Sequence, residues 1–311
     1  MKLRGFSCVA ALALSLGTAN WLLLLLALPV NVLLSLLLPK QGRQSEHFGG
    51  LLSFLVGICV PIVLLVFANR AFADRMVTSL FHESPSILFL ALIMVLTFLL
   101  SLGGAARFIN ASALFFWVVF GLLFVIAAMS LWQIKPERLA VNWDVPPLSA
   151  LSVGAVFVLG GFLRPGKAWG GVVFSNAAAA VAAAITLGLL GSSLVARSDN
   201  PLFAAVSSLM VPGVMERVDA AVISLWLLAD VTLMMLLITV ALSVIRDLFN
   251  VRRLWIPSLI IHALVFAGAV FADKNWAATA ESVCFAVIAA GVLLSFIVGL
   301  FRKRVANLAQ K

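Results

Sequence analysis

The sequence AAVISLWLLADVTLMMLLITVALSVI, residues 220–245, is long and apolar enough to cross a lipid bilayer and contains one charge, Asp230. A transmembrane helix needs about 20 predominantly apolar residues. A charge inside such a stretch is rare, because its transfer from water into hydrocarbon is unfavourable. This stretch therefore predicts a membrane-spanning helix, and it marks one carboxylate as a candidate for a functional role.

The rest of the chain has the same character over most of its 311 residues. Hydrophobic residues make up 64% of it and charged residues 11%, whereas soluble domains contain about a quarter charged residues. One water-soluble core could not bury so much apolar surface, so lipid is the expected solvent. The basic residues stand singly or in short clusters between apolar runs, which is typical of orienting charges in membrane proteins and not of a nucleic-acid-binding surface.

Apolar runs on both sides of residues 220–245 predict an all-α integral membrane protein of about ten helices, in one polytopic domain over residues 1–311. The first run, 6–38, is too long for one span, and a break at Gly17-Thr18-Ala19-Asn20 leaves 6–17 as a short or incomplete helix. The alternative for that piece is a signal peptide cleaved after Ala19. The expected spans are 6–17 (partial), 21–38, 49–69, 85–106, 108–134, 145–163, 168–196, 220–245, 254–272 and 282–301.

The charges between these spans predict the orientation. With ten helices, one side of the membrane carries twice as many Lys and Arg residues as the other, and the C-terminus lies on the richer side. Cytoplasmic loops carry the excess of basic residues, so we expect the C-terminus in the cytoplasm. Arg70 and Arg75 fall in an expected loop on the opposite side. A short re-entrant or interfacial helix is expected over residues 201–209.

Asp230 lies about halfway between Glu216 and Arg246, which predicts a position near the middle of the bilayer. A carboxylate there costs on the order of 2.5–3.5 kcal/mol, so it is expected to face a cavity, a partner or a coupling cation. The alternative is a protonated Asp that makes one interhelical hydrogen bond. Trp226 and Met234 lie on the same helical face, where they would line a ligand or simply pack.

Other polar residues also lie within or beside the spans. His262 is expected to hydrogen-bond to a neighbouring helix, with a proton relay as the alternative. Asn31, Asn110 and Asn176 each need a partner, and asparagine commonly joins transmembrane helices. The alanine-rich residues 177–184 predict close packing of helices, because small side chains let backbones approach each other.

The span 145–163 has the composition of a broken helix. It begins with Pro146-Pro147, contains Ser149, Ser152 and Gly154, and ends near Gly160-Gly161. A break exposes backbone N–H and C=O groups, which transporters use to bind a carboxylate or a cation near the middle of the membrane. The alternative is a glycine-rich packing face.

No pattern indicates an enzyme. The three histidines, His47, His82 and His262, are scattered along the chain. The sequence has no paired carboxylates, nucleophile elbow, HExxH motif or phosphate-binding loop. The three cysteines have no paired spacing and are interpreted as small buried apolar residues. No metal or cofactor is expected.

Five local features follow one another between about residues 18 and 272. They are Trp21-Leu22 at the start of a span, Glu83-Ser84-Pro85 before another, Gly104 and Arg107 after it, Phe162-Leu163-Arg164-Pro165 at the end of the broken span, and Asn200-Pro201 leading through Ser207-Ser208 to Glu216-Arg217-Val218-Asp219-Ala220 and Trp226. In order and spacing they resemble the permease-like B subunit of endospore germinant receptors, a family of the amino acid–polyamine–organocation transporter superfamily.

The resemblance implies two inverted repeats of five helices each, with substrate held between broken helices one and six. Residues 21–38 would be helix two, 145–163 helix six, and Asp230 would lie in helix eight beside the site. It further implies a multi-pass subunit of the spore inner membrane that senses a small nutrient germinant, with an amino acid as the expected class. The expected partners are an A-type receptor subunit and a C-type lipoprotein, and the expected ligand-binding residues are Ser149, Ser152, Gly154, Trp226 and Asp230.

Two other functions remain as alternatives. A cation- or proton-coupled amino-acid transporter would use Asp230 as its coupling group, and a non-transporting scaffold subunit would need no ligand. Two departures from the family argue against ordinary transport. Helix one is reduced to 6–17, and Val153 and Ala155 stand where helix six of the family commonly has an aromatic residue and a glutamate.

Overall fold

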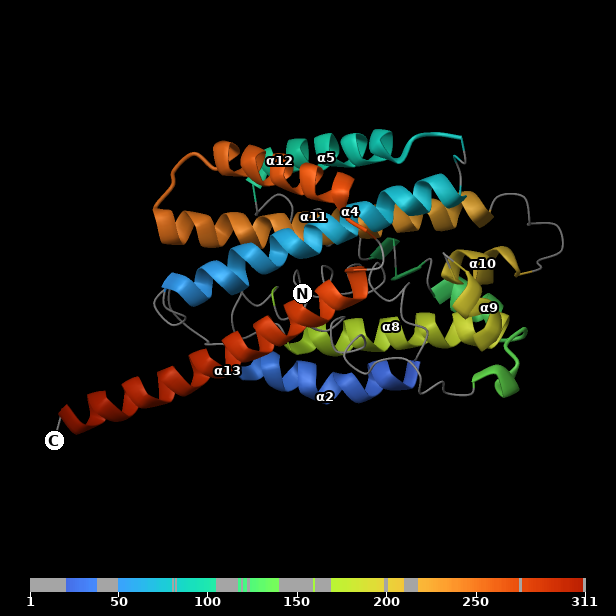
Figure 1. The fold of residues 1–311 in the computed structure, drawn as a ribbon. Coiled ribbons are helices and arrows are strands. Elements are labelled where there is room, and N and C mark those ends of the chain that lie inside the picture. The colour runs from blue at the N-terminus through green and yellow to red at the C-terminus, as the bar shows by residue number, and fades with distance from the viewer. Residues whose placement is uncertain are drawn as a thin grey trace.

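The computed structural model consists of helices and connections, with no strand in the residues that it describes (Figure 1). The described residues are 21–37, 50–79, 81, 83–104, 117–118, 120–121, 124–139, 159, 169–198, 201–209, 218–273 and 276–309. The partial span 6–17 and almost all of 145–163 lie outside them. The prediction of an all-α membrane protein is confirmed at the level of class.

Four helical segments are long and apolar enough to cross a membrane, by length and composition: Gly50–Thr78, Trp169–Leu190, Leu227–Phe249 and Thr279–Val298. Three shorter apolar helices have 17 residues each: α2 (Trp21–Leu37), α5 (Ser86–Leu102) and α12 (Trp255–Phe271). Many large apolar side chains on α2, α5, α12 and α13 (Ala277–Ala309) are exposed, as expected where lipid replaces water around a protein. The chain is therefore membrane-associated.

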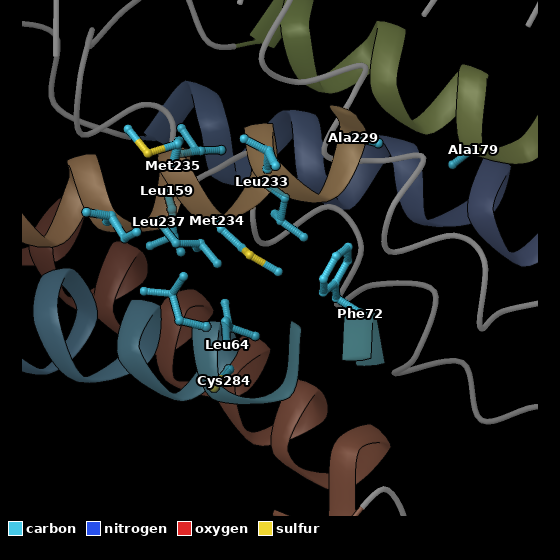
Figure 2. Close-up of a cluster of buried hydrophobic side chains, with 14 of the residues drawn as sticks. Leu64, Phe72, Leu159, Ala179, Ala229, Leu233, Met234, Met235, Leu237 and Cys284 are labelled. Carbon is cyan, nitrogen blue, oxygen red and sulfur yellow. The ribbon is translucent and has the colours of Figure 1, made fainter. Parts of the chain in front are cut away.

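The central helix is α11 (Val218–Phe249). In its apolar stretch, 83% of the residues are buried inside the protein, a larger share than in the other three long segments. It packs against α4 (Val60–Ser79), α5, α12 and the short α10 (Pro201–Ser207). Figure 2 shows Leu233 and Met234 of α11 beside Phe72 of α4 in the buried apolar cluster. The core thus lies mainly between α11 and the helices around it.

The helices α4 and α11 run antiparallel. Near one end Gly57 lies against Val244, so close that a Cβ on the glycine would be 2.6 Å from Val244 Cγ2. Near the other end Arg75 contacts Asp230. Gly57 belongs to a π-helical turn, η1 (Leu55–Cys59), which precedes α4. The π turn comes just before Pro61, which lacks the N–H that would continue regular α-helical hydrogen bonding.

Two further helix pairs are antiparallel as well. In α5 and α12, Thr97 meets His262 while Ser101 meets Ser258. In α2 and α8 (Trp169–Leu190), the beginning of one helix lies at the end of the other. Trp21 Nε1 donates to the carbonyl of Leu139 at 3.2 Å, and the adjacent Arg138 donates to the carbonyl of Leu189. These bonds attach the 3-10 turn η2 (Pro136–Leu139) to both helices.

The tight packing of α2 on α8 follows from the alanine run. Ala179, Ala180, Ala182 and Ala183 are all buried on α8, and α2 packs along that helix. The helix α13 contacts both α2 and α4, and its C-terminal part extends beyond the other helices (Figure 1). α13 therefore joins the α2–α8 pair to the rest of the bundle.

Several helix boundaries differ from the sequence-based expectation, two of them markedly. The segment expected to end as a span at residue 69 continues through charged residues to Ser79. The segment expected as one span over 168–196 is divided at Gly191, where α8 ends and α9 (Ser192–Arg197) begins. Gly191 has a φ of +82°, which L-residues rarely adopt and glycine adopts readily. Residues 201–207 are helical, as α10, and the placement of that helix in or at the membrane stays a prediction.

Candidate functional site

The strongest polar contact inside the bundle is an ion pair between Arg75 of α4 and Asp230 of α11. The guanidinium Nη2 lies 2.5 Å from Asp230 Oδ2, and the side chains are 14% and 2% exposed. Their neighbours on the two helices, Phe72, Ala229 and Leu233, are buried and apolar. Asp230 therefore has a protein partner, which was one of the three environments expected for it.

A second ion pair lies close to this one on α4. One turn earlier on α4, Arg70 Nε lies 3.1 Å from Asp74 Oδ2, and these two side chains are 28% and 31% exposed. Among the described side chains, the end of α4 and the facing part of α11 thus hold two ion pairs. The better-buried pair matters more for stability, because a buried charge that loses its partner keeps its full desolvation cost.

The ion pair lies near one end of α4. Asp230 lies opposite Arg75, which is one turn before the end of α4 at Ser79. The position of Asp230 near the middle of the bilayer stays a prediction.

The sequence does not predict Arg75 as a site residue, because Arg70 and Arg75 fall in an expected loop. A signal for a continuing helix was present in the same stretch. Arg70 and Asp74 have the i,i+4 spacing of a helical ion pair, and the buried Phe72, Ala73 and Met76 continue an apolar helical face. The partnership with Asp230 could not be inferred in this way, because it depends on how two distant helices pack.

The structure describes only some of the other expected ligand-binding residues. Ser149, Ser152 and Gly154 lie outside the described residues. Trp226 lies on α11, one helical turn before Asp230. Met234 is fully buried in the apolar cluster (Figure 2), so for this residue the packing interpretation agrees with the structure. The structure thus brings together Asp230 and Arg75, a residue that was not expected at the site.

A second polar cluster joins the C-terminal half of α5 to the N-terminal half of α12. His262 Nε2 lies 3.3 Å from Thr97 Oγ1, and His262 Nδ1 lies 2.7 Å from the carbonyl oxygen of Ser258. The hydroxyls of Ser258 and Ser101 are 2.7 Å apart. The Phe98 ring packs edge-to-face with the His262 imidazole, and the ring centroids are 5.4 Å apart. His262 is therefore hydrogen-bonded to a neighbouring helix, as expected.

A third polar contact joins α2 and α8. Asn31 Nδ2 donates to Asn176 Oδ1 at 3.3 Å, and Asn176 Nδ2 donates to the carbonyl of Val172 at 2.9 Å. Both asparagines are fully buried. The prediction that asparagine joins the helices holds for these two, whereas Asn110 lies outside the described residues.

We expect Asn31→Leu to destabilise the protein by about 0.6–1.7 kcal/mol, the range of single interhelical hydrogen bonds in membranes. The free energy of unfolding in mixed detergent micelles measures this loss. Asn69→Leu is the matched control, because its amide donates only within its own helix, to the carbonyl of Leu65, and its Oδ1 has no partner in the described part of the chain. If both variants lose the same stability, the Asn31–Asn176 contact contributes nothing specific.

Comparison with known proteins adds no assignment. No family model matches the chain, and no curated protein matches it. Within the described residues, no group of three or more His, Cys, Asp and Glu side chains is arranged to hold a metal ion. The ion pair and the two hydrogen-bonded contacts are thus the polar features on which a function can be argued.

Proposed function

We propose that this chain is a permease-like, multi-pass membrane subunit with about ten helices in two inverted five-helix repeats. Inverted repeats place equivalent helices of the two halves in opposite directions across the membrane. In that scheme α2, α4 and α5 are helices two, three and four, and α8, α11 and α12 are helices seven, eight and nine. The observation that supports this proposal most strongly is that each of these equivalent pairs packs together and is antiparallel.

Two details agree with this proposal. The fourth and ninth helices, α5 and α12, have the same length of 17 residues. Each equivalent pair is also joined by polar side chains: Asn31 with Asn176, Arg75 with Asp230, and Thr97 with His262. A polar group without a hydrogen-bond partner inside a membrane costs several kcal/mol. The polar contacts therefore favour one defined arrangement of the two halves.

We further propose that the subunit senses a small nutrient germinant, with an amino acid as its class. The Arg75–Asp230 pair supports this class of ligand on chemical grounds. An amino acid carries a carboxylate, which a guanidinium binds well, and an ammonium, which a carboxylate binds. The carboxylate of the ligand can therefore pair with Arg75 and its ammonium with Asp230. Neither side chain is then left buried with an unpaired charge. Ser149, Ser152, Gly154 and Trp226 stay in the proposal as further ligand-binding residues.

The proposed orientation gives the pair a place in a sensing mechanism. The distribution of basic residues assigns the end of α4 to the non-cytoplasmic side, with the C-terminus in the cytoplasm. A nutrient arriving from outside would meet the Arg75–Asp230 pair on that side and compete with it. A ligand shifts a conformational equilibrium only by its difference in affinity for the two states. A ligand that binds only when the Arg75–Asp230 pair is open has such a difference in affinity. The resulting conformational change would be transmitted to the A-type subunit and the lipoprotein of a spore inner-membrane receptor.

The test is capture of the tagged chain from detergent-solubilised membranes of its source cells, together with germination assays on variants. We expect a larger receptor subunit and a lipoprotein to co-purify. We also expect Asp230→Ala and Ser152→Ala to abolish the germination response to amino acids.

Two outcomes would contradict the sensor. Accumulation of labelled alanine by vesicles that contain only this chain, abolished by Asp230→Asn, would identify a coupled transporter instead. Loss of germination on deletion of the gene, with no effect of Asp230→Ala and Ser152→Ala, would identify a scaffold subunit.

A further inference from the structure

The contact between α5 and α12 contains an imidazole whose two nitrogens have different partners. Nδ1 lies 2.7 Å from the backbone carbonyl oxygen of Ser258. Because a carbonyl oxygen can only accept, Nδ1 carries a hydrogen in this geometry. In the neutral ring, Nε2 is then an acceptor, and it faces Thr97 Oγ1 at 3.3 Å.

The Thr97 hydroxyl can serve either form of the ring. Its oxygen lies 2.8 Å from the carbonyl oxygen of Ile93, one turn earlier on α5. When the imidazole is neutral, the single hydroxyl hydrogen can point to Nε2. When Nε2 is protonated, the hydroxyl can accept from it and donate its own hydrogen to Ile93. Both protonation states are thus fully hydrogen-bonded, and they differ only by rotation of one hydroxyl group.

The cluster continues toward the end of the helices. Ser258 Oγ lies 2.7 Å from Ser101 Oγ, and Ser101, which is half-buried, stands in the last turn of α5. His262 and Ser258 are themselves buried. Hydroxyl groups therefore line the side of the imidazole that leads toward the helix ends, while Phe98 packs against the ring.

Among the described side chains of α4 and α11, which pack against α12, each charged group lies in an ion pair. On α4, Arg70 pairs with Asp74, and Arg75 pairs with Asp230 of α11. At the far end of α11, Arg246 Nε lies 3.5 Å from Asp247 Oδ1. Helix α5 has no ionisable side chain. Among the described residues, the imidazole therefore has hydroxyl and carbonyl oxygens as its hydrogen-bond partners, and no carboxylate.

We infer that His262 is a reversible proton-binding site inside the membrane domain, in which Thr97 and the Ser258 carbonyl hold the imidazolium. A proton from water adds to the lone pair of Nε2, the ring gains one positive charge, and the Thr97 hydroxyl turns from Nε2 to the Ile93 carbonyl. Hydrogen bonds to charged groups are about twice as strong as neutral ones, so the bound proton tightens the contact between α5 and α12. The inference does not depend on the function proposed above.

The test is nitrogen NMR of the full-length protein in nanodiscs, with ¹⁵N-labelled histidine and with His47 and His82 replaced by glutamine. We expect Nδ1 of His262 to be protonated throughout. We expect Nε2 to change from the unprotonated to the protonated signal as the pH is lowered, over a range in which the helices stay folded. The circular dichroism of the helices should be unchanged over this range. A ring that stays neutral until the helices unfold would overturn the inference.

The role of Thr97 has its own test with a matched control. Thr97→Val removes the acceptor of the charged form and should weaken proton binding about tenfold, the difference between a charged and a neutral hydrogen bond. Thr239→Val removes an equally buried hydroxyl that bonds only to the Met235 carbonyl of its own helix, and it should leave the titration unchanged. Equal titrations of the two variants would contradict the role of Thr97. If a variant no longer binds a nutrient but His262 still binds a proton, the proposed sensing function fails and the proton site stands.

Discussion

Replacing Asp230 with alanine is expected to destabilise the protein by about 3–5 kcal/mol, the effect of removing one partner of a buried ion pair. The reason is that the Arg75 guanidinium, only 14% exposed, would remain in the protein without its carboxylate. Arg75→Ala is expected to have an effect of similar size, since Asp230 is 2% exposed. Unfolding in mixed detergent micelles measures both losses.

The adjacent pair on the same helix is the control. Arg70 and Asp74 are about twice as exposed as Arg75 and have i,i+4 spacing, so Asp74→Ala should cost only about 0.3–0.5 kcal/mol. If Asp74→Ala and Asp230→Ala have equal effects, the Arg75–Asp230 pair is not buried in the way described.

A double variant separates stability from function at this pair. Substitution of both partners by apolar residues of similar size, Arg75→Met with Asp230→Leu, removes both charges and leaves neither unpaired. Such replacements are often neutral or stabilising, so this variant should fold while it no longer responds to an amino acid. A variant that both folds and responds would show that the pair serves only stability.

The second large effect is expected at Gly57. A Cβ at this position would be 2.6 Å from Cγ2 and 3.0 Å from Cγ1 of Val244, so either the Val244 side chain or one of the two helices must shift. Gly57→Ala should therefore destabilise the protein by about 1–3 kcal/mol, the usual effect of overpacking. The same unfolding measurement gives this value.

Gly50→Ala is the matched control for Gly57→Ala. Gly50 lies at the beginning of the same long helix, and a methyl group added there would meet no atom of the described residues within 4 Å. The effect of this substitution should stay within about 0.5 kcal/mol. Adding Val244→Ala to Gly57→Ala should restore part of the lost stability, because it removes the two clashing methyl groups. Absence of any rescue would argue that Val244 is not the neighbour of Gly57.

The class of the fold could be predicted from the sequence because long uncharged runs have few physical solutions. Residues 21–37 and 255–271, for example, carry no Asp, Glu, Lys or Arg and are mostly apolar, and both form helices. The importance of Asp230 was also predictable, since a carboxylate in an apolar span needs a partner. The interhelical contacts of Asn31, Asn176 and His262 followed from the same requirement for buried polar groups.

What could not be predicted depends on tertiary packing. The hydrogen bond between Arg75 and Asp230 joins residues 155 positions apart, and no local pattern selects that partner among the basic residues. The charges after residue 69 predict the end of a span there, although a helix that is anchored by an ion pair can carry charges in its last turns. The break at Gly191 was missed because one glycine in an apolar run is compatible with a continuous helix.

The account depends most on the antiparallel packing of α4 against α11, which thiol cross-linking tests directly. In a chain whose three native cysteines are replaced by alanine, cysteine pairs are introduced at positions 57 and 244, and at positions 75 and 230. A short bifunctional thiol reagent is then applied in membranes, and cross-linked chains are detected by their mobility after cleavage of the connection between the helices. The account predicts efficient cross-linking for 57 with 244 and for 75 with 230, and none for the exchanged pairs 57 with 230 and 75 with 244. Cross-linking of the exchanged pairs, or of neither set, would contradict it.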